Sequence, residues 1–348
     1  MSSGFAKRYR RAGSVSAGFS LIELLVATAI GALVTLLIAT VFANNSKTNE
    51  VSQASNEVQE QAAVALDMLQ RDLRMAGYSG CNSNRMLGSG ALVNTSAAPT
   101  GYLDAVGAYL QGHEGSGAGF DPTAPAEVTG ASPAPIDTFD AVTVRIPAAE
   151  PVALSGTMGS ATATIPVYST ADYAVGTRAL ISDCAQSAAF VVTSTAGGLM
   201  HAAGALNATA DLGRAYGIDA SVVPMQTVTY YVGASSYAPL GTEQSLWRRV
   251  NMAGTSEEVA EGVEEFQLLY GIDTNDDRSA DVFDTADNVA DWSQVIAVRA
   301  SLLLHSKSPN AARNPQSFDF NGQTDVVPAD QRLRRPLNAT ILLRNRTP

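Results

Sequence analysis

The sequence predicts an α+β protein in which one long N-terminal helix is followed by a largely antiparallel, β-rich head. Residues 19–77 contain no proline, and their second half repeats apolar residues at helical spacing. After residue 77 this period stops, and short runs of β-branched and aromatic residues follow between turn residues. Crossover helices between these runs are not evident, so the strands are expected to pair antiparallel.

The charge of the chain is acidic and unevenly distributed. The formal net charge is −11, and residues 1–18 hold four basic residues and no acidic one. The remaining chain therefore carries 18 basic against 33 acidic residues. A nucleic-acid partner needs clustered Lys and Arg opposite its phosphates, so this composition argues against nucleic acid.

Residues 19–44 form the first half of the expected helix and are apolar enough to cross a membrane. Residues 19–43 contain one charged residue, Glu23, and span about 37 Å as a helix, against a hydrocarbon core of about 30 Å. The basic residues before them favour a cytoplasmic N-terminus, which places the chain after Asn44 outside the cytoplasm. A secretory signal peptide fits poorly because its apolar core is shorter and precedes the cleavage site.

Glu23 decides between a plain signal anchor and a more specialised segment. A carboxylate inside a membrane helix is costly and needs a partner, which a plain anchor does not provide. Glu23 lies within the stretch Gly18-Phe19-Ser20-Leu21-Ile22-Glu23-Leu24-Leu25-Val26. This stretch resembles the prepilin signal of bacterial type IV pilins and type II secretion pseudopilins.

The resemblance implies how the N-terminus is processed and used. Prepilin peptidase would remove residues 1–18 as a leader by cleaving between Gly18 and Phe19, and the new terminus at Phe19 would be N-methylated. Glu23 would pair with the terminal amine of a neighbouring subunit and fix the register between subunits. An ammonium beside it would make a buried carboxylate tolerable.

Residues 45–77 are expected to continue the helix out of the membrane as its amphipathic half. Asp67 and Arg71 have the favourable acid-first order, and Gly77 is the expected C-cap. Gly31 is the one weak point of the helix. The apolar stripe is expected to pack on a sheet of the head, and a coiled-coil seam is the weaker alternative because of its alanines. The stripe consists of Val51, Ala54, Val58, Ala62, Ala65, Leu69, Leu73 and Ala76.

Residues 78–348 are expected to form the periplasmic head. Residues 86–135 are rich in Gly, Ala, Ser, Thr and Pro, and are predicted to form long loops with minor strands. The expected strands are residues 141–147, 164–168, 178–182, 190–194, 227–232, 245–250, 262–270, 295–304 and 340–344. The aromatic residues in the strand patterns are predicted to be core: Tyr230, Tyr231, Trp247, Phe266, Tyr270 and Trp292.

A second resemblance covers the C-terminal hundred residues. It rests on residues 262–266 (GVEEF), 269–273 (LYGID), 292–298, 333–335 and 343–346. With the N-terminus, these stretches resemble the PilW family of type IV pilus minor pilins, and pieces are similar to the J-type minor pseudopilin of type II secretion. The resemblance implies a minor pilin anchored in inner-membrane lipid before assembly. It would then join other minor and major pilins in a filament-tip complex that primes assembly and supports adhesion or surface sensing.

The two cysteines, Cys81 and Cys184, both follow the membrane segment. They therefore lie on the expected oxidising side, where a disulfide is favoured over free thiols. Two cysteines allow only one connectivity. Catalysis by a thiol pair needs C-x-x-C spacing, which this sequence lacks.

An acidic loop at residues 273–284 is the best candidate for a cofactor site. Its oxygen-bearing side chains have the spacing of a calcium loop, in which alternate residues converge on one cation. The sixth position is Arg278 rather than Gly, and the twelfth is Asp rather than Glu. The alternative is a solvated acidic turn. The candidate calcium ligands are Asp273, Asn275, Asp277, Ser279, Asp281 and Asp284.

Motifs for catalysis are missing from the sequence. His113, His201 and His305 are far apart and lie in no metal or nucleophile motif, and no Walker loop, G-x-S-x-G or H-E-x-x-H is present. We therefore expect a structural subunit rather than an enzyme. A membrane-anchored periplasmic enzyme is the alternative from another functional class.

Overall fold

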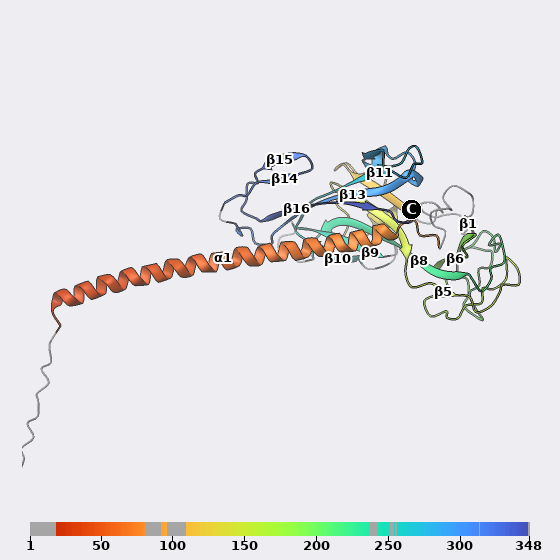
Figure 1. Ribbon diagram of the computed structural model, residues 1–348, viewed down its shortest axis with the longest axis horizontal. Helices are drawn as coiled ribbons and strands as arrows, with labels where there is room; N and C mark the ends of the chain where they lie inside the picture. Colours follow the sequence, from red (N-terminus) through yellow and green to blue (C-terminus); the bar gives the residue numbers. More distant parts are fainter. Residues whose placement is uncertain are drawn as a thin grey trace, which may run out of the picture. The chain divides into compact units, whose positions relative to one another are not determined.

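The computed structural model describes residues 19–80, 92–95, 109–236, 243–250, 254, 256–312 and 314–346. Its internal contacts divide the chain into two compact units, Met1–Gln53 and Ala54–Pro348. The first described element is the helix α1, Leu21–Met75, and every described strand belongs to the second unit (Figure 1).

Helix α1 runs without interruption for 55 residues, which confirms the predicted continuous helix. Gly77 has a φ of 79°, the left-handed conformation expected of a C-cap glycine. The side-chain amide of Asn345 donates hydrogen bonds to the carbonyls of Met75 (3.1 Å) and Ala76 (3.2 Å). These bonds satisfy carbonyls that the last turn of a helix leaves unpaired.

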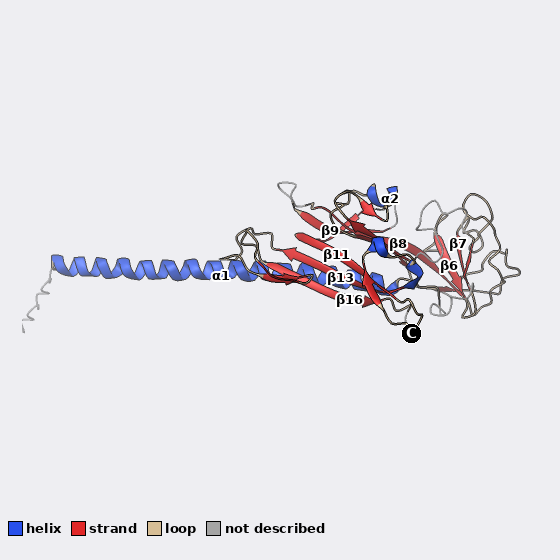
Figure 2. Cartoon of the chain, turned by 90° about the horizontal axis from the view of Figure 1, so that it is seen from above, coloured by secondary structure: helices blue, strands red, loops and turns tan. Residues whose placement is uncertain are grey.

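The second half of α1 buries the predicted apolar stripe. Its buried residues Val58, Ala62, Ala65, Leu69 and Leu73 belong to one core cluster with residues from both large sheets. Figure 2 shows β13 and β16 crossing this part of the helix, with β11 and β9 to one side. The stripe therefore packs on the head of its own chain and is not available as a coiled-coil seam.

The larger sheet has ten strands in the order β1-β7-β6-β8-β4-β2-β3, with β5 and β9 also paired to β8, and β10 paired to β9. All its pairs are antiparallel except the parallel pair β1–β7. The strands are β1 Leu92–Asn94, β2 Leu110–Gly115, β3 Phe120–Asp121, β4 Ala141–Pro147, β5 Val152–Ala153, β6 Arg178–Ser182, β7 Ser187–Val191, β8 Ser221–Ala234, β9 Gln244–Val250 and β10 Ser256–Glu261.

The smaller sheet is antiparallel, with four strands in the order β12-β11-β13-β16. Its strands are β11 Val263–Ile272, β12 Val282–Asp284, β13 Val295–His305 and β16 Arg334–Leu342. A separate hairpin pairs β14, Phe318–Phe320, with β15, Gln323–Val326. The short helices are α2 Ala126–Thr129, η2 Ala286–Asn288 and η3 Trp292–Gln294. The predicted α+β class with a largely antiparallel head is therefore present.

Most predicted strands coincide with observed ones, and one is wrong. Residues 141–147 and 178–182 match β4 and β6, and four others lie within or nearly within β8, β9, β11 and β13. Residues 190–194 and 340–344 only overlap the ends of β7 and β16. Residues 164–168 form no strand. Ile165 and Val167 make only isolated bridges, because Pro166 between them cannot donate to a ladder.

The predicted aromatic core is confirmed. Tyr230, Tyr231, Phe266 and Tyr270 are at most 1 % exposed and Trp247 is buried, while Trp292 packs on the same core from its edge. A second cluster around Phe190, Leu199 and Tyr216 fills the region of β6 and β7.

An ionic contact fixes α1 on the larger sheet. The Oδ2 atom of Asp72 accepts hydrogen bonds from the hydroxyl of Tyr230 (2.7 Å) and from Nε of Arg248 (2.8 Å). Asp72 is 6 % exposed, so these two hydrogen bonds are needed to stabilise its buried charge. Lys307 adds a second link, since its ammonium lies 3.1 Å from Glu57 of α1 and 2.6 Å from Glu261.

Asp140 joins the two sheets to each other. One of its carboxylate oxygens accepts the backbone N–H of Gly115 in β2 (3.1 Å), and the other accepts that of Leu268 in β11 (2.6 Å). Burial, together with the nearby charge of Glu114, raises the pKa of Asp140 to about 7, although the two amides act in the opposite direction.

This shift predicts that Asp140 makes the native state less stable as pH rises. The native carboxyl keeps its proton up to about pH 7, whereas the unfolded chain loses it near the ordinary value of 3.8. The native state therefore binds more protons in this range, and its free energy of unfolding falls with rising pH, by up to about 4 kcal/mol for this shift. Asp140→Asn should abolish this slope.

The measurement is denaturant unfolding of residues 54–348 at pH 4 to 8, for wild type and Asp140→Asn. Other groups titrate in this range, so the difference between the two proteins isolates Asp140. The lost acceptor adds a constant offset, but the difference should shift in favour of the variant as pH rises. A difference that is flat with pH contradicts the raised pKa.

Candidate functional site

The start of α1 is built by Ser20 and Glu23. The backbone N–H of Ser20 donates to Oε2 of Glu23 (2.9 Å), and the backbone N–H of Glu23 donates to Oγ of Ser20 (3.2 Å). This reciprocal pair is a capping box, which satisfies two amides at a helix start. Within the described residues, Oε1 of Glu23 accepts no hydrogen bond, so this oxygen is available to another donor.

Apolar side chains surround Glu23 along the helix. Ile22, Val26, Ala27 and Ile30 line a shallow groove with it. From Phe19 to Phe42 the large apolar side chains of this chain are exposed. In the part of the chain that the structure describes, α1 is a helix long and apolar enough to cross a membrane. A continuous apolar surface of this kind requires lipid or other helices around it.

The acidic loop connects β11 to β12 and begins at Asp273, which is 6 % exposed. The carboxylate of Asp273 accepts the backbone N–H groups of Arg278 (2.7 Å), Asn275 (3.3 Å) and Asp277 (3.3 Å). Oδ1 of Asn275 accepts the N–H of Asp277 (2.9 Å), and Oδ1 of Asp277 accepts that of Ser279 (2.8 Å). The loop thus winds around its own side-chain oxygens.

The remaining candidate ligands have other partners. Oδ2 of Asp281 accepts the N–H and the hydroxyl of Thr274 (2.8 and 2.6 Å), which holds the pKa of Asp281 below its ordinary value. Asp284 lies in β12 and accepts the N–H of Thr285 (2.9 Å) and the side-chain amide of Asn288 (3.0 Å). Arg278, at the position where a calcium loop has glycine, adopts a left-handed φ of 69°.

These contacts bring Asp273, Asn275, Asp277 and Ser279 into one turn, while Asp284 sits apart in a strand. No three His, Cys, Asp or Glu side chains among the described residues are grouped so that they could hold a metal ion. Calcium binding by this loop therefore stays a prediction.

The predicted disulfide involves one cysteine that the structure places and one that it does not. Cys184 lies in the turn between β6 and β7, and Cys81 lies outside the described residues. The carbonyl of Ser79 accepts a hydrogen bond from the hydroxyl of Ser187 (2.5 Å). Gly80 lies so close to Ser182 that a side chain there would collide with it. The chain just before Cys81 therefore lies against the hairpin that carries Cys184.

The three histidines have structural contacts far from one another. Nδ1 of His113 is 2.6 Å from the carbonyl of Pro122, and Nε2 of His201 is 2.9 Å from that of Ala163. Nδ1 of His305 lies 3.1 Å from the carbonyl of Ser306. Burial lowers the pKa of all three.

The sequence patterns did not identify Asp72 and Asp140, the carboxylates that connect α1 and the two sheets. Asp72 carried a usable signal, because it lies beside Leu73 and one turn from Leu69 within the buried stripe. Asp140 carried none, since only the fold brings β2 and β11 to it.

Comparison with known protein families gives two matches. Residues 229–345, from β8 through β16, match the family described as type IV pilus-assembly protein W, PilW. Residues 14–39 match the prokaryotic N-terminal methylation motif. No curated protein and no solved structure matches the chain.

The two matches agree with the geometry of the chain. The methylation motif covers the cap of α1 and its exposed apolar surface, which fit a pilin anchored in the inner membrane. The PilW match covers the smaller sheet and its contacts with α1, and both motifs indicate a structural protein. Together, the two matches support a type IV pilin of the PilW family.

Proposed function

We propose that this chain is a minor pilin of the tip-associated complex that primes assembly of a type IV pilus. The observation that carries the proposal is the presence of the methylation motif, at residues 14–39, and the PilW match, at residues 229–345, in one chain. The PilW match favours a pilus over a secretion pseudopilus. The proposed partners are prepilin peptidase and the other minor and major pilins.

Processing prepares the subunit for a neighbour. Prepilin peptidase cleaves between Gly18 and Phe19, and the new, N-methylated terminus carries a positive charge. Oε2 of Glu23 is engaged in the capping box, while Oε1 has no partner within the described residues. One carboxylate can therefore cap its own helix and accept the ammonium of the next subunit at the same time.

Assembly then exchanges one apolar environment for another. In the inner membrane, acyl chains cover the exposed side chains between Phe19 and Phe42, and in the filament neighbouring helices replace them. The segment does not pass through water, because exposing its surface costs about 25 cal/mol per Å². The head remains outside the cytoplasm and selects the subunits beside it.

The first test separates the two roles of Glu23. Glu23→Gln keeps an acceptor for the capping box but removes the charge that meets the ammonium, whereas Glu23→Ala removes both. Both variants should be processed to Phe19, as read by mass spectrometry of the mature N-terminus. Both should lose most co-purification with partner pilins and most piliation.

The comparison between these variants is decisive for the pairing role. If Glu23→Gln piliates like wild type while Glu23→Ala does not, the capping box and not the charge pair is the function of this residue. A mature N-terminus at any residue other than Phe19 would refute the processing step and, with it, the pilin function proposed here.

We also propose that Cys81 and Cys184 form a disulfide, supported by the contacts of Ser79 and Gly80 with the β6–β7 hairpin. The bond would close a loop of roughly 100 residues, for which a stabilisation of about 2–4 kcal/mol is typical. Replacing Cys184 with Ser should lower the free energy of unfolding by this amount. Peptide mapping of the unreduced wild type should show the two cysteines linked, and a free thiol at either position would contradict the bond.

Calcium is proposed as the ligand of the acidic loop, supported by the single turn that gathers Asp273, Asn275 and Asp277. Calcium should raise the melting temperature of the head relative to chelator. Asp277→Asn keeps an oxygen for the N–H of Ser279 but removes a charge, so it should reduce this shift. Identical wild-type melting curves in calcium and chelator would leave the loop as a solvated acidic turn.

A further inference from the structure

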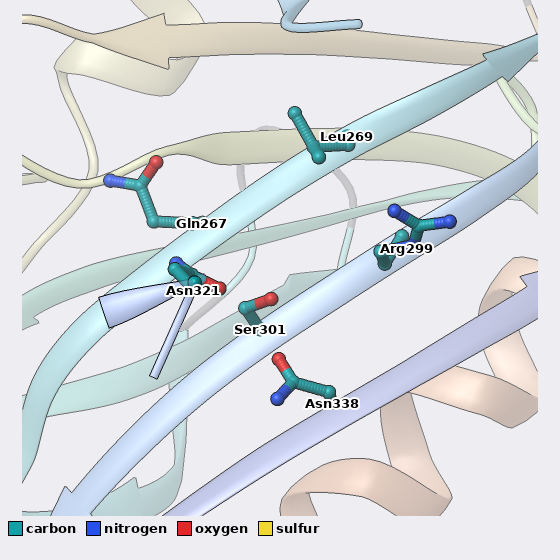
Figure 3. Close-up of a pocket in the computed structure, with 7 residues that line it drawn as sticks. Gln267, Leu269, Arg299, Ser301, Asn321 and Asn338 are labelled. Atoms are coloured by element: carbon teal, nitrogen blue, oxygen red, sulfur yellow. The ribbon is translucent and has the colours of Figure 1, made fainter. Parts of the chain in front are cut away.

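The face of the smaller sheet that points away from α1 carries a pocket of about 500 Å³ (Figure 3). Strands β11, β13 and β16 form its floor, and the tip of the β14–β15 hairpin contributes to its wall. Its polar lining consists of Gln267, Arg299, Ser301, Asn321 and Asn338.

The alternation of the strands explains why this face is polar. Phe266, Leu268 and Tyr270 of β11 belong to the core cluster that includes α1. Gln267 and Leu269 therefore point to the opposite face. The register places Gln267 opposite Ser301 and Ser301 opposite Asn338, so that three polar side chains form one row across three strands.

The hairpin that closes the pocket has a defined tip. Phe320 pairs with Gln323, and Asn321 and Gly322 between them have φ values of 48° and 81°. Two left-handed residues in the order Asn-Gly are typical of a type I′ turn. The turn brings Asn321 to the polar row, where Figure 3 shows its side chain among those of Gln267 and Ser301.

The polar row and the neighbouring Asn321 have unused hydrogen-bonding capacity. The side chains of Gln267, Ser301, Asn321 and Asn338 line the pocket, and no hydrogen bond joins any of them to another described residue. Each carboxamide offers donors and an acceptor next to each other, and the hydroxyl offers both. Their arrangement matches a ligand that carries several hydroxyl groups.

Arg299 gives the pocket a positive charge. Its guanidinium carbon lies 4.1 Å from the centre of the Phe283 ring, which positions it by stacking. No carboxylate of the described chain pairs with Arg299, and the described residues that line the pocket include no acid. The guanidinium can therefore donate to an anionic group. A carboxylate is such a group, and it can accept two of the guanidinium's hydrogen bonds at once.

We propose that this pocket binds a carboxylated sugar. The hydroxyls of the sugar would meet the carboxamides and Ser301, its carboxylate would meet Arg299, and Leu269 would contact the apolar face of the ring. The volume lies within the range of roughly 300–1,000 Å³ common for small-ligand sites. An extended peptide would instead add to the edge of a sheet through its backbone, which this face does not offer.

The test uses the full chain in lauryldimethylamine oxide, a detergent without a sugar headgroup. Saturation-transfer NMR with digalacturonate should show binding, and lactose, a neutral disaccharide, should bind more weakly. Arg299→Gln and Asn338→Ala should each weaken digalacturonate binding roughly tenfold, because the first removes the charge that meets the carboxylate and the second removes a carboxamide that meets a hydroxyl. Arg344→Gln, an equal change of charge at an exposed residue outside the pocket, should bind like wild type.

Arg299 and Asn338 are both exposed, and thermal melting confirms that each variant folds. Absence of transfer to digalacturonate overturns the proposal, as does wild-type binding by both pocket variants. Equal binding of lactose and digalacturonate overturns the assignment of the carboxylate to Arg299. None of these outcomes depends on processing at Phe19 or on pilus assembly, so the ligand site is tested independently of the proposed function.

Discussion

The head depends on the burial of one face of α1 against both sheets. Ala62 and Ala65 are small enough for the helix backbone to approach the strands closely, and Leu69 and Leu73 fill the core beyond them. Apolar packing alone would allow α1 to shift along its axis against the sheets, because the alanines of the stripe have small side chains. The buried contact of Asp72 with Tyr230 and Arg248 permits only one register, because any displacement would leave a charge in the core without its partner.

The same helix has opposite requirements at its two ends. From Val58 to Leu73 the residues of its apolar stripe are buried inside the chain, whereas the exposed apolar side chains from Phe19 to Phe42 can be covered only by other molecules. A folded head can therefore exist before assembly, while the N-terminal segment always needs lipid or neighbouring helices. The capping box suits this arrangement, since it starts the helix with local bonds and leaves one oxygen of Glu23 for a neighbour.

Local patterns predicted the local structure of this chain well. The helix, its cap at Gly77, the buried stripe and most central strands follow from spacing and composition. Strand β2 falls in residues 86–135, where only minor strands without positions were predicted, and it was not located because its sequence, LQGHEG, has no β-branched residue. It forms because β4 pairs with it and because Gly112 leaves space for Tyr270, where a side chain would collide. The contacts of Asp140 and the polar row were not predicted for a related reason. Their residues are brought together by strands that are distant in sequence.

Strand β13 shows how one element can serve both stability and recognition. Val298, Ala300 and Leu302 point into the core beneath α1, while Arg299 and Ser301 between them point into the pocket. Because alternate residues face opposite sides, a change at Arg299 or Ser301 leaves the helix contact intact. Substitutions at these outward-facing positions can therefore alter the pocket without altering the packing of α1 on the sheet.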